Sequence, residues 1–314
     1  MSRQVFCFVS DCHAPFHDEK AILLAAARIE ELRPDLLILG GDILDCFLAG
    51  RFPRVGARIT KFVQELEGAR WVIDTLADRC PNARKVYLEG NHEMRHKVAI
   101  ATMGMVPGFL EGYPGISLEE ALDLKAKGIL YVHSRAGNAS IKIGPLLFSH
   151  GSLYGQKPAK AELMANLCSG VSGHVHRMTE HRVTSSTSGV DWRWQTSGCL
   201  SQDAHYADRN SEQLGFVSGW LDEETGQYDM HSEKMHRSAP NGPVTLYTPN
   251  GMYRAFDTPS GVSIVCDTYE ANGKHKPTNP RKVGKVTRSR ASQGYKKSYG
   301  KLKQIQTKLR NRKA

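Results

Sequence analysis

Seven residues of kinds that bind metal ions lie where predicted strands end. They occur in the short sequences SDCH, GGD, EGNHE, FSHG and SGHVH, and they are Asp11, His13, Asp42, Asn91, His150, His174 and His176. Carboxylate and amide oxygens with imidazole nitrogens form a mixed donor set that suits Mn²⁺, Fe, Zn²⁺ or Ni²⁺. The set is large enough for two divalent ions about 4 Å apart that share a bridging carboxylate. We therefore expect a two-metal site, with Mn²⁺ first and Fe, Zn²⁺, Ni²⁺ or Mg²⁺ as alternatives.

Strand and helix patterns alternate over the first two thirds of the chain and must position these residues. The apolar patterns predict buried strands at 5–10, 36–39 and 85–88 and helices at 19–33 and 60–79. Asp18 is placed to cap the first helix and Pro34 to end it. This βαβ alternation is typical of an α/β fold with a sheet buried on both faces. Open α/β sheets carry their sites at the carboxyl ends of strands, where the motifs lie.

The later segments of the chain are predicted to have several different structures. Strands are predicted at 141–143, 146–149, 181–187, 191–196, 215–221 and 227–231, with a helix at 159–167 and a hairpin turn at 224–226. Between two of the motifs, 95–135 is a lid, a substrate-facing insertion or a purely structural excursion, and it contains a capping box from Ser117 to Glu120. The segment 241–270 is weakly patterned, which fits short strands or an extended wrap. We expect a domain at 1–240, an extension at 241–270 and a tail at 271–314.

The motif order DxH, GD, GNHE, a lone histidine and GHxH resembles the calcineurin-like metallophosphoesterase superfamily, which includes dimetal phosphatases, phosphodiesterases and DNA-processing nucleases. The match runs from Asp11 to His176. The resemblance implies a four-layer α/β/β/α sandwich with two mixed sheets, in which the β-rich segment up to about His231 supplies the second sheet. It also implies a hydrolase that acts on phosphoesters.

The resemblance implies a role for each motif residue. Two sets of terminal ligands would flank a shared carboxylate: Asp11, His13 and His176 on one metal, Asp42 as the bridge, and Asn91, His150 and His174 on the other. His92 would bind no metal and would face the phosphate, where it stabilises the transition state or protonates the leaving oxygen. A hydroxide held between the metals would attack phosphorus in line.

Two of the motifs, taken alone, have an ordinary structural explanation. Asp11 and His13 fit a common strand-to-loop turn, and Gly41 with Asp42 fits a simple turn. Agreement of five motifs in order favours the metal site over these explanations. The main alternative is an inactive relative, and no ligand position is lost here.

Differences from the superfamily patterns narrow the range of possible substrates. Serine/threonine protein phosphatases carry GDxxDRG, whereas here Asp45 is followed by Cys46 and Phe47, which puts that branch in doubt. Arg95 matches the arginine of GNHExR and is predicted to contact phosphate, with a surface salt bridge as the alternative. Asp45, with the arginines at 51 and 54, either lines the cleft or belongs to a solvated loop.

The charge distribution sets the C-terminal segment apart. From Ala271 to Ala314 there are fifteen Lys or Arg and no Asp or Glu, which leaves 27 basic and 32 acidic residues in the remainder. Such a tail attracts polyanions through counterion release. We therefore expect DNA or RNA as a partner, contacted by Lys282, Lys285, Arg288, Arg290, Lys296 and Lys297. The alternatives are a solubilising or host-directed tail, or one that binds ribosomes or membrane lipid.

The seven cysteines are odd in number and form no CxxC pair, so we expect reduced core residues and not disulfides or a zinc cluster. Cys12 lies within the first motif, where it fills space or approaches the metals. The run from Val5 to Val9 is too short for a signal peptide or a membrane span. These features predict a cytoplasmic protein with no membrane span.

Three functions fit these observations. The first is a phosphodiesterase or nuclease that acts on nucleic acid. The second is a phosphatase or phosphodiesterase that acts on small-molecule or protein phosphoesters. The third is a nucleic-acid-binding protein whose metal-binding domain is not catalytic, although seven intact ligand positions and His92 argue against it.

Overall fold

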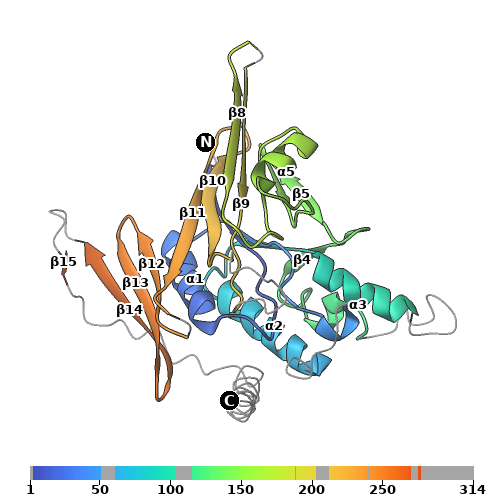
Figure 1. The fold of residues 1–314 in the computed structure, drawn as a ribbon, viewed down its shortest axis with the longest axis vertical. Helices are drawn as coiled ribbons and strands as arrows, with labels where there is room; N and C mark the ends of the chain where they lie inside the picture. The colour runs from blue at the N-terminus through green and yellow to red at the C-terminus, as the bar shows by residue number, and fades with distance from the viewer. Residues whose placement is uncertain are drawn as a thin grey trace, which may run out of the picture.

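Two mixed β-sheets with helices on their outer faces make up the fold (Figure 1). The computed structural model describes residues 3–50, 61–102, 115–187, 189–202, 212–239, 241–269 and 275–276. A ten-stranded sheet has the order β15-β14-β13-β12-β11-β10-β1-β2-β3-β4, and a five-stranded sheet has the order β5-β6-β7-β9-β8. Across these ranges no helix is both long and apolar enough to span a membrane.

The larger sheet has a parallel half and an antiparallel half. Its parallel strands are β1 (Arg3–Val9), β2 (Leu36–Leu39), β3 (Arg84–Leu88) and β4 (Ile129–Val132). On the other edge of β1, the antiparallel strands are β10 (Gly215–Asp222), β11 (Tyr228–Arg237), β12 (Val244–Thr248), β13 (Gly251–Thr258), β14 (Gly261–Tyr269) and β15 (His275–Lys276).

The smaller sheet and the helices complete the layers. The sheet contains β5 (Ser140–Ile143), β6 (Leu146–Ser149), β7 (Gly170–Ser172), β8 (Glu180–Ser185) and β9 (Val190–Thr196). The α-helices are α1 (Glu19–Leu32), α2 (Phe62–Ala77), α3 (Asn91–Thr102), α4 (Leu118–Ala121) and α5 (Pro158–Asn166), and η1 (Phe47–Ala49) is a 3₁₀ turn.

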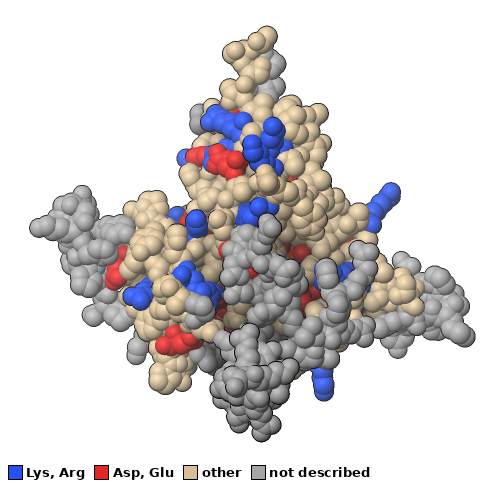
Figure 2. Space-filling view, viewed as in Figure 1, with Lys and Arg blue, Asp and Glu red and all other residues tan. Residues whose placement is uncertain are grey.

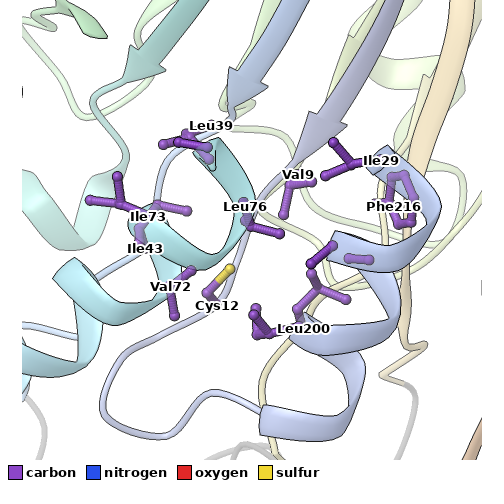
Figure 3. Close-up of a cluster of buried hydrophobic side chains, with 14 of the residues drawn as sticks. Val9, Cys12, Ile29, Leu39, Ile43, Val72, Ile73, Leu76, Leu200 and Phe216 are labelled. Carbon is purple, nitrogen blue, oxygen red and sulfur yellow. The ribbon is translucent and has the colours of Figure 1, made fainter. Parts of the chain in front are cut away.

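Alternation along β1 explains why the molecule has layers. Phe6 and Phe8 point toward the smaller sheet, where their rings lie 5.1 and 6.3 Å from that of Phe148 on β6. Cys7 and Val9 point the other way, into the core beneath α1 and α2 (Figure 3). On the smaller sheet, α5 packs over Trp194 of β9. The expected α/β/β/α order is therefore confirmed.

Most predicted elements of the first 200 residues form within about two residues of their expected ends. The Asp18 side chain accepts hydrogen bonds from the backbone N–H groups of Lys20 and Ala21, as expected of a cap. The capping box at α4 is only half formed, since Ser117 accepts from the Glu120 N–H while the Glu120 carboxylate accepts from the Gly115 N–H. The prediction of a complete capping box was therefore wrong.

The strands at 215–221 and 227–231 belong to a different sheet from the one expected. They form β10 and β11, which extend the larger sheet from β1, so only β8 and β9 of the β-rich segment join the smaller sheet. A period-2 pattern predicts a strand but carries no information about its partner. At the opposite edge, Ile129–Val132 of the 95–135 segment forms β4, which is an integral strand of the larger sheet.

The weakly patterned segment after residue 240 forms the well-paired strands β12, β13 and β14. These strands lie beside α1 (Figure 1), which also packs against α2 and contacts β10, so α1 is buried along most of its length. The domain boundaries at 240 and 270 stay a prediction, although these strands continue the sheet of the preceding domain.

A charged network fastens α1 to the C-terminal strands. The Glu31 carboxylate accepts hydrogen bonds from Asn250 Nδ2 at 2.8 Å, Tyr253 OH at 2.9 Å and Arg28 Nη1 at 2.8 Å. Burial raises the pKa of Glu31, but the hydrogen bonds outweigh it, so the pKa lies below its ordinary value. Arg28 continues the network to the buried carboxylate of Glu233 on β11.

We expect Glu31→Gln to lower the free energy of unfolding by about 1–2 kcal/mol at pH 7, because hydrogen bonds to a charged group are lost. A carboxyl with a lowered folded pKa stabilises the fold above its unfolded pKa of about 4.3, and this contribution disappears as pH falls through the folded pKa. The difference between wild type and variant should therefore shrink below about pH 4. Urea unfolding at pH 7 and pH 3.5 measures it.

Glu30→Gln is the matched control, because the exposed Glu30 makes a single 3.3 Å contact with Arg79. A change below about 0.5 kcal/mol is expected for it. Equal effects at both positions would contradict the assigned role of Glu31.

Candidate metal centre

Five strands of the two sheets end at one place and deliver the motif residues there. Asp11 and His13 follow β1, Asp42 follows β2, Asn91 and His92 begin α3 after β3, His150 follows β6, and His174 and His176 follow β7. Because these strands end at the same edge, residues up to 165 positions apart in the sequence become neighbours. The structure brings all eight predicted residues together.

Asp11, His13 and His176 form the first group, whose ligand atoms converge. The Nε2 atoms of His13 and His176 lie 3.0 Å apart, and Asp11 Oδ1 lies 3.3 Å from His176 Nε2. All three residues are buried. Two imidazole nitrogens and one carboxylate oxygen that meet at a point are a typical donor set for a divalent transition metal.

Asp42, His150 and His174 form the second group, with Asn91 beside it. His150 Nε2 lies 3.4 Å from Asp42 Oδ2 and 3.1 Å from Asn91 Oδ1. Asp42 lies between the two groups, since its carboxylate also shares a third convergent set with His13 and His92. An arrangement with Asp42 in the middle is what a bridging carboxylate requires.

The free ring nitrogens fit a metal better than any other partner. His174 Nε2 is buried and has no hydrogen-bond partner among the described residues. The opposite ring nitrogens are held by protein oxygens: His150 Nδ1 lies 2.8 Å from the Gly40 carbonyl, and His176 Nδ1 lies 3.1 Å from Glu212 Oε1. Such contacts orient an imidazole so that Nε2 can bind a metal. The residues present therefore fit two metal ions.

The pKa shifts of charged groups within the cluster also favour a bound cation. Burial raises the pKa of Asp42, but the charge of His150 outweighs it, and the Asp42 pKa lies well below its ordinary value. Burial lowers the pKa of His150, yet the Asp42 carboxylate raises it to about 10. The buried carboxylate thus keeps a proton on its neighbour. A bound cation competes with that proton, because only a neutral imidazole binds metal.

Five of the seven candidate ligands have a backbone conformation that is rare for residues other than glycine. The φ angles are +56° at Asp11, +50° at His13, +52° at Asp42, +72° at His174 and +54° at His176. Each such conformation costs roughly 1–2 kcal/mol. Backbone hydrogen bonds between the loops hold it, including Asp11 N–H to the Gly41 carbonyl at 3.0 Å and His13 N–H to the Asp42 carbonyl at 2.9 Å.

Glu93 holds the loop that carries Asp42. Its buried carboxylate accepts hydrogen bonds from the N–H groups of Asp42, Ile43, Leu44 and Gly90 and from Tyr87 OH. Burial and the nearby Asp42 charge raise the pKa of Glu93 to about 7. Gly90 is required by this packing, because a Cβ there would lie 2.3 Å from Asp42 Oδ1. The EGNHE motif therefore shapes the adjacent motif as well as supplying Asn91 and His92.

Asp45 connects His92 to the first group. It is 1% exposed, and its Oδ1 lies 3.3 Å from His13 Nδ1 and 3.2 Å from His92 Nδ1. Burial raises the pKa of Asp45, but the contacts with His13 and His92 lower it far below its ordinary value. The solvated-loop interpretation was wrong for this residue. The arginines at 51 and 54 lie outside the described residues.

Arg95 lies against His92 at the wall of a pocket. Its Nη2 is 2.7 Å from His92 Nε2, and its Nη1 donates to the Asp45 carbonyl at 3.2 Å. Within the described part of the chain Arg95 makes no ion pair, so the salt-bridge alternative gains no support. A phosphate contact by Arg95 stays a prediction. The pocket, of about 640 Å³, also borders Asn91 and His174.

Three further residues of the site escaped prediction from the sequence. Glu212 orients His176, Glu93 holds the Asp42 loop, and Tyr154 lies with its ring 4.3 Å from that of His174. Glu212 and Tyr154 carry no motif that would reveal them. Glu93 lies within a motif, but the matched pattern assigns it no partner.

Cys12 fills space in the core. All seven cysteines are free, and the Cys12 side chain lies beside Val72, Leu76 and Leu200 (Figure 3). Burial raises the pKa of Cys12 well above its ordinary value, which keeps the thiol protonated. It belongs to none of the convergent metal-binding groups in the described ranges.

Comparisons with known proteins agree with this geometry. A sequence model described as calcineurin-like phosphoesterase matches residues 5–243, well over half of the chain. No curated protein sequence matches significantly. A Vps29 single mutant from Entamoeba histolytica is 12% identical, covers 85% of this chain and 99% of its own, and gives a TM-score of 0.35. A dimetal phosphatase from Danio rerio is 13% identical, with 73% and 95% coverage and a TM-score of 0.38. Likeness at this level carries no conclusion about activity.

The family match and the clustered side chains lead to the same assignment. The match spans every motif residue, from Asp11 to His176. The family uses a dimetal centre, and the convergent Asp and His groups fit one. The chain therefore belongs to the calcineurin-like phosphoesterase family and is a phosphoester hydrolase.

Proposed function

We propose that the chain hydrolyses phosphoesters with two divalent metal ions held by the seven motif residues. Asp11, His13 and His176 would hold one ion, Asn91, His150 and His174 the other, and Asp42 both. The observation that carries this proposal is the convergence of the His13 and His176 Nε2 atoms, 3.0 Å apart, beside the buried and unpartnered His174 Nε2. When bound, the ions would neutralise phosphate charge and lower the pKa of a water ligand. Mn²⁺ is the proposed native metal.

His92 is proposed as the residue that acts on the leaving oxygen. Its Nε2 lies 3.7 Å from Asp42 Oδ2, while its Nδ1 lies 2.7 Å from the Asp45 carbonyl. A Nδ1–H group that donates to this carbonyl fixes the ring and directs Nε2 toward the substrate side. A histidine can donate a proton to a leaving alkoxide near neutral pH.

Nucleic acid is the proposed class of substrate, with cytoplasmic action. The support is the basic tail, whose named residues, Lys282, Lys285, Arg288, Arg290, Lys296 and Lys297, lie outside the described residues. On the face shown in Figure 2, several Lys and Arg side chains lie beside Asp or Glu. Ion pairs of the described residues include Arg182–Asp191 and Arg193–Glu180. We assign attraction of a polyanion to the tail. Small-molecule and protein phosphoesters remain the alternative substrates.

Substitution of the shared carboxylate should remove metal and activity together. We expect Asp42→Asn to retain fewer Mn²⁺ ions after dialysis and to lose at least about 100-fold in kcat, because ligand loss exceeds the usual 10–100-fold effect of substituting a residue that only orients a ligand. Elemental analysis of the dialysed protein and initial rates on bis-p-nitrophenyl phosphate measure both. Metal affinity should rise with pH as the imidazoles lose their protons.

Asp191→Asn serves as the control, because this exposed aspartate pairs with Arg182 far from the cluster. It should keep full metal content and activity. Unchanged metal content in Asp42→Asn would contradict the bridging role.

The two roles for His92 predict different dependence on the leaving group. If His92 protonates the leaving oxygen, His92→Asn should lower kcat by about 10²–10⁴-fold for an alkyl ester but much less for a p-nitrophenyl ester, whose phenolate leaves without a proton. If it stabilises the transition state, both esters should lose equally. Rates at equal metal content distinguish the two. His133→Asn, at an exposed position beside Glu119, is the control. Full activity of His92→Asn on both esters would rule out both roles.

Removal of the tail should weaken binding of DNA without changing the active site. Truncation after Lys276 keeps β15 and removes thirteen basic residues. We expect about tenfold or greater loss of affinity for a DNA oligonucleotide at 50 mM salt and a shallower dependence of log K on log salt. Fluorescence anisotropy across a salt series measures this, with turnover of bis-p-nitrophenyl phosphate as the internal control. An unchanged salt slope would exclude the tail as the nucleic-acid contact.

A further inference from the structure

Tyr154 holds an exposed aromatic ring at the edge of the metal cluster. The side chain is 72% exposed, yet its ring centroid lies 4.3 Å from that of His174, with a 55° angle between the planes. Large aromatic side chains usually bury their rings, and exposed ones beside a site are often binding residues. Nothing in the core requires a ring at this position.

The loop that carries Tyr154 is fixed on both sides of it. Before it, the N–H groups of Ser152 and Leu153 donate to the buried Glu162 carboxylate of α5 at 2.8 and 3.0 Å. After it, Arg177 donates to the Gly155 carbonyl. These anchors belong to different elements, so the ring is held in place by tertiary contacts. A ring held in advance loses little conformational entropy when a ligand stacks on it.

The pocket beside Tyr154 has both polar and apolar lining residues. Asn91 and His174 belong to the metal cluster, while Met94, Val98 and Ala136 are apolar. Arg95 is the only Lys, Arg, Asp or Glu side chain among the described lining residues. One cation suits a single phosphate, and the apolar residues suit an uncharged group attached to it. The volume of about 640 Å³ is sufficient for a nucleoside-sized group.

We propose that this pocket binds a flat aromatic group attached to the scissile phosphate, a nucleobase or similar ring, with Tyr154 as the stacking surface and Met94 and Val98 as further apolar contacts. The inference rests on the proposed function, because it assumes that the phosphate is bound at the metal cluster. It adds a substrate class that does not depend on the basic tail. Stacking on a side chain tolerates any base, so it predicts affinity for aromatic groups with little sequence preference.

Binding of two phosphate monoesters to the Mn²⁺-loaded full chain tests this. Deoxyadenosine 5′-monophosphate carries the flat group, and methyl phosphate does not. By calorimetry we expect the nucleotide to bind at least about tenfold more tightly to the wild type, since stacking on one ring contributes about that much. Tyr154→Ala should weaken nucleotide binding about tenfold and leave methyl phosphate unchanged. Tyr154→Phe should behave as wild type, and Tyr154→Leu should resemble Tyr154→Ala.

Tyr247→Ala is the matched control, because Tyr247 is 57% exposed on β12 and its ring also lies near an imidazole, 6.2 Å from that of His236. It should change neither affinity. If methyl phosphate binds in a Mn²⁺-dependent manner but the nucleotide binds no more tightly, or if Tyr154→Ala weakens both equally, the stacking proposal is overturned while the proposed function stands. If neither ester binds in a metal-dependent manner, the proposed function fails and this inference fails with it.

Discussion

The arrangement of the whole site depends on two buried carboxylates that lie in one cluster. Asp11 is fully buried and Asp42 is 2% exposed, and an uncompensated buried charge costs several kcal/mol. Imidazoles surround both, and the Asp42 carboxylate raises the pKa of His150 to about 10. Divalent cations held by the same residues would supply the positive charge that the carboxylates require. Backbone contacts of the site keep the Asp11 and Asp42 carboxylates close together.

Backbone contacts hold the loops that bring these like charges close together. Five candidate ligands have positive φ angles, a conformation that persists only where the surroundings impose it. Hydrogen bonds between the loops after β1 and β2 impose it on Asp11 and His13. The Glu93 carboxylate receives the N–H groups of the Asp42 loop, and Gly90 allows that loop to approach. The hydrophobic core that includes residues of α1, α2 and the parallel strands also includes Cys12 and Ile43 of these loops.

In the proposed function, two regions with different physical properties would recognise the substrate. The pocket that includes Arg95 and Tyr154 would contact the group attached to the phosphate at short range. As proposed, the fifteen basic residues after 270 would attract a polyanion at longer range and without regard to its sequence. His92, held by Asp45, lies beside Asp42 at the metal cluster where the phosphate would be bound.

The sequence by itself determined the family, the α/β class, most elements before residue 200 and the eight residues that meet at the site. It did so because local periodicity and the order of short motifs are properties of the chain alone. The tertiary structure decided which strands pair, so β10 and β11 join the larger sheet. It also assigned partners to Asp45, Glu212 and Tyr154, whose contacts cross tens of residues or more. Contacts at such separations depend on strand order, which no local pattern contains.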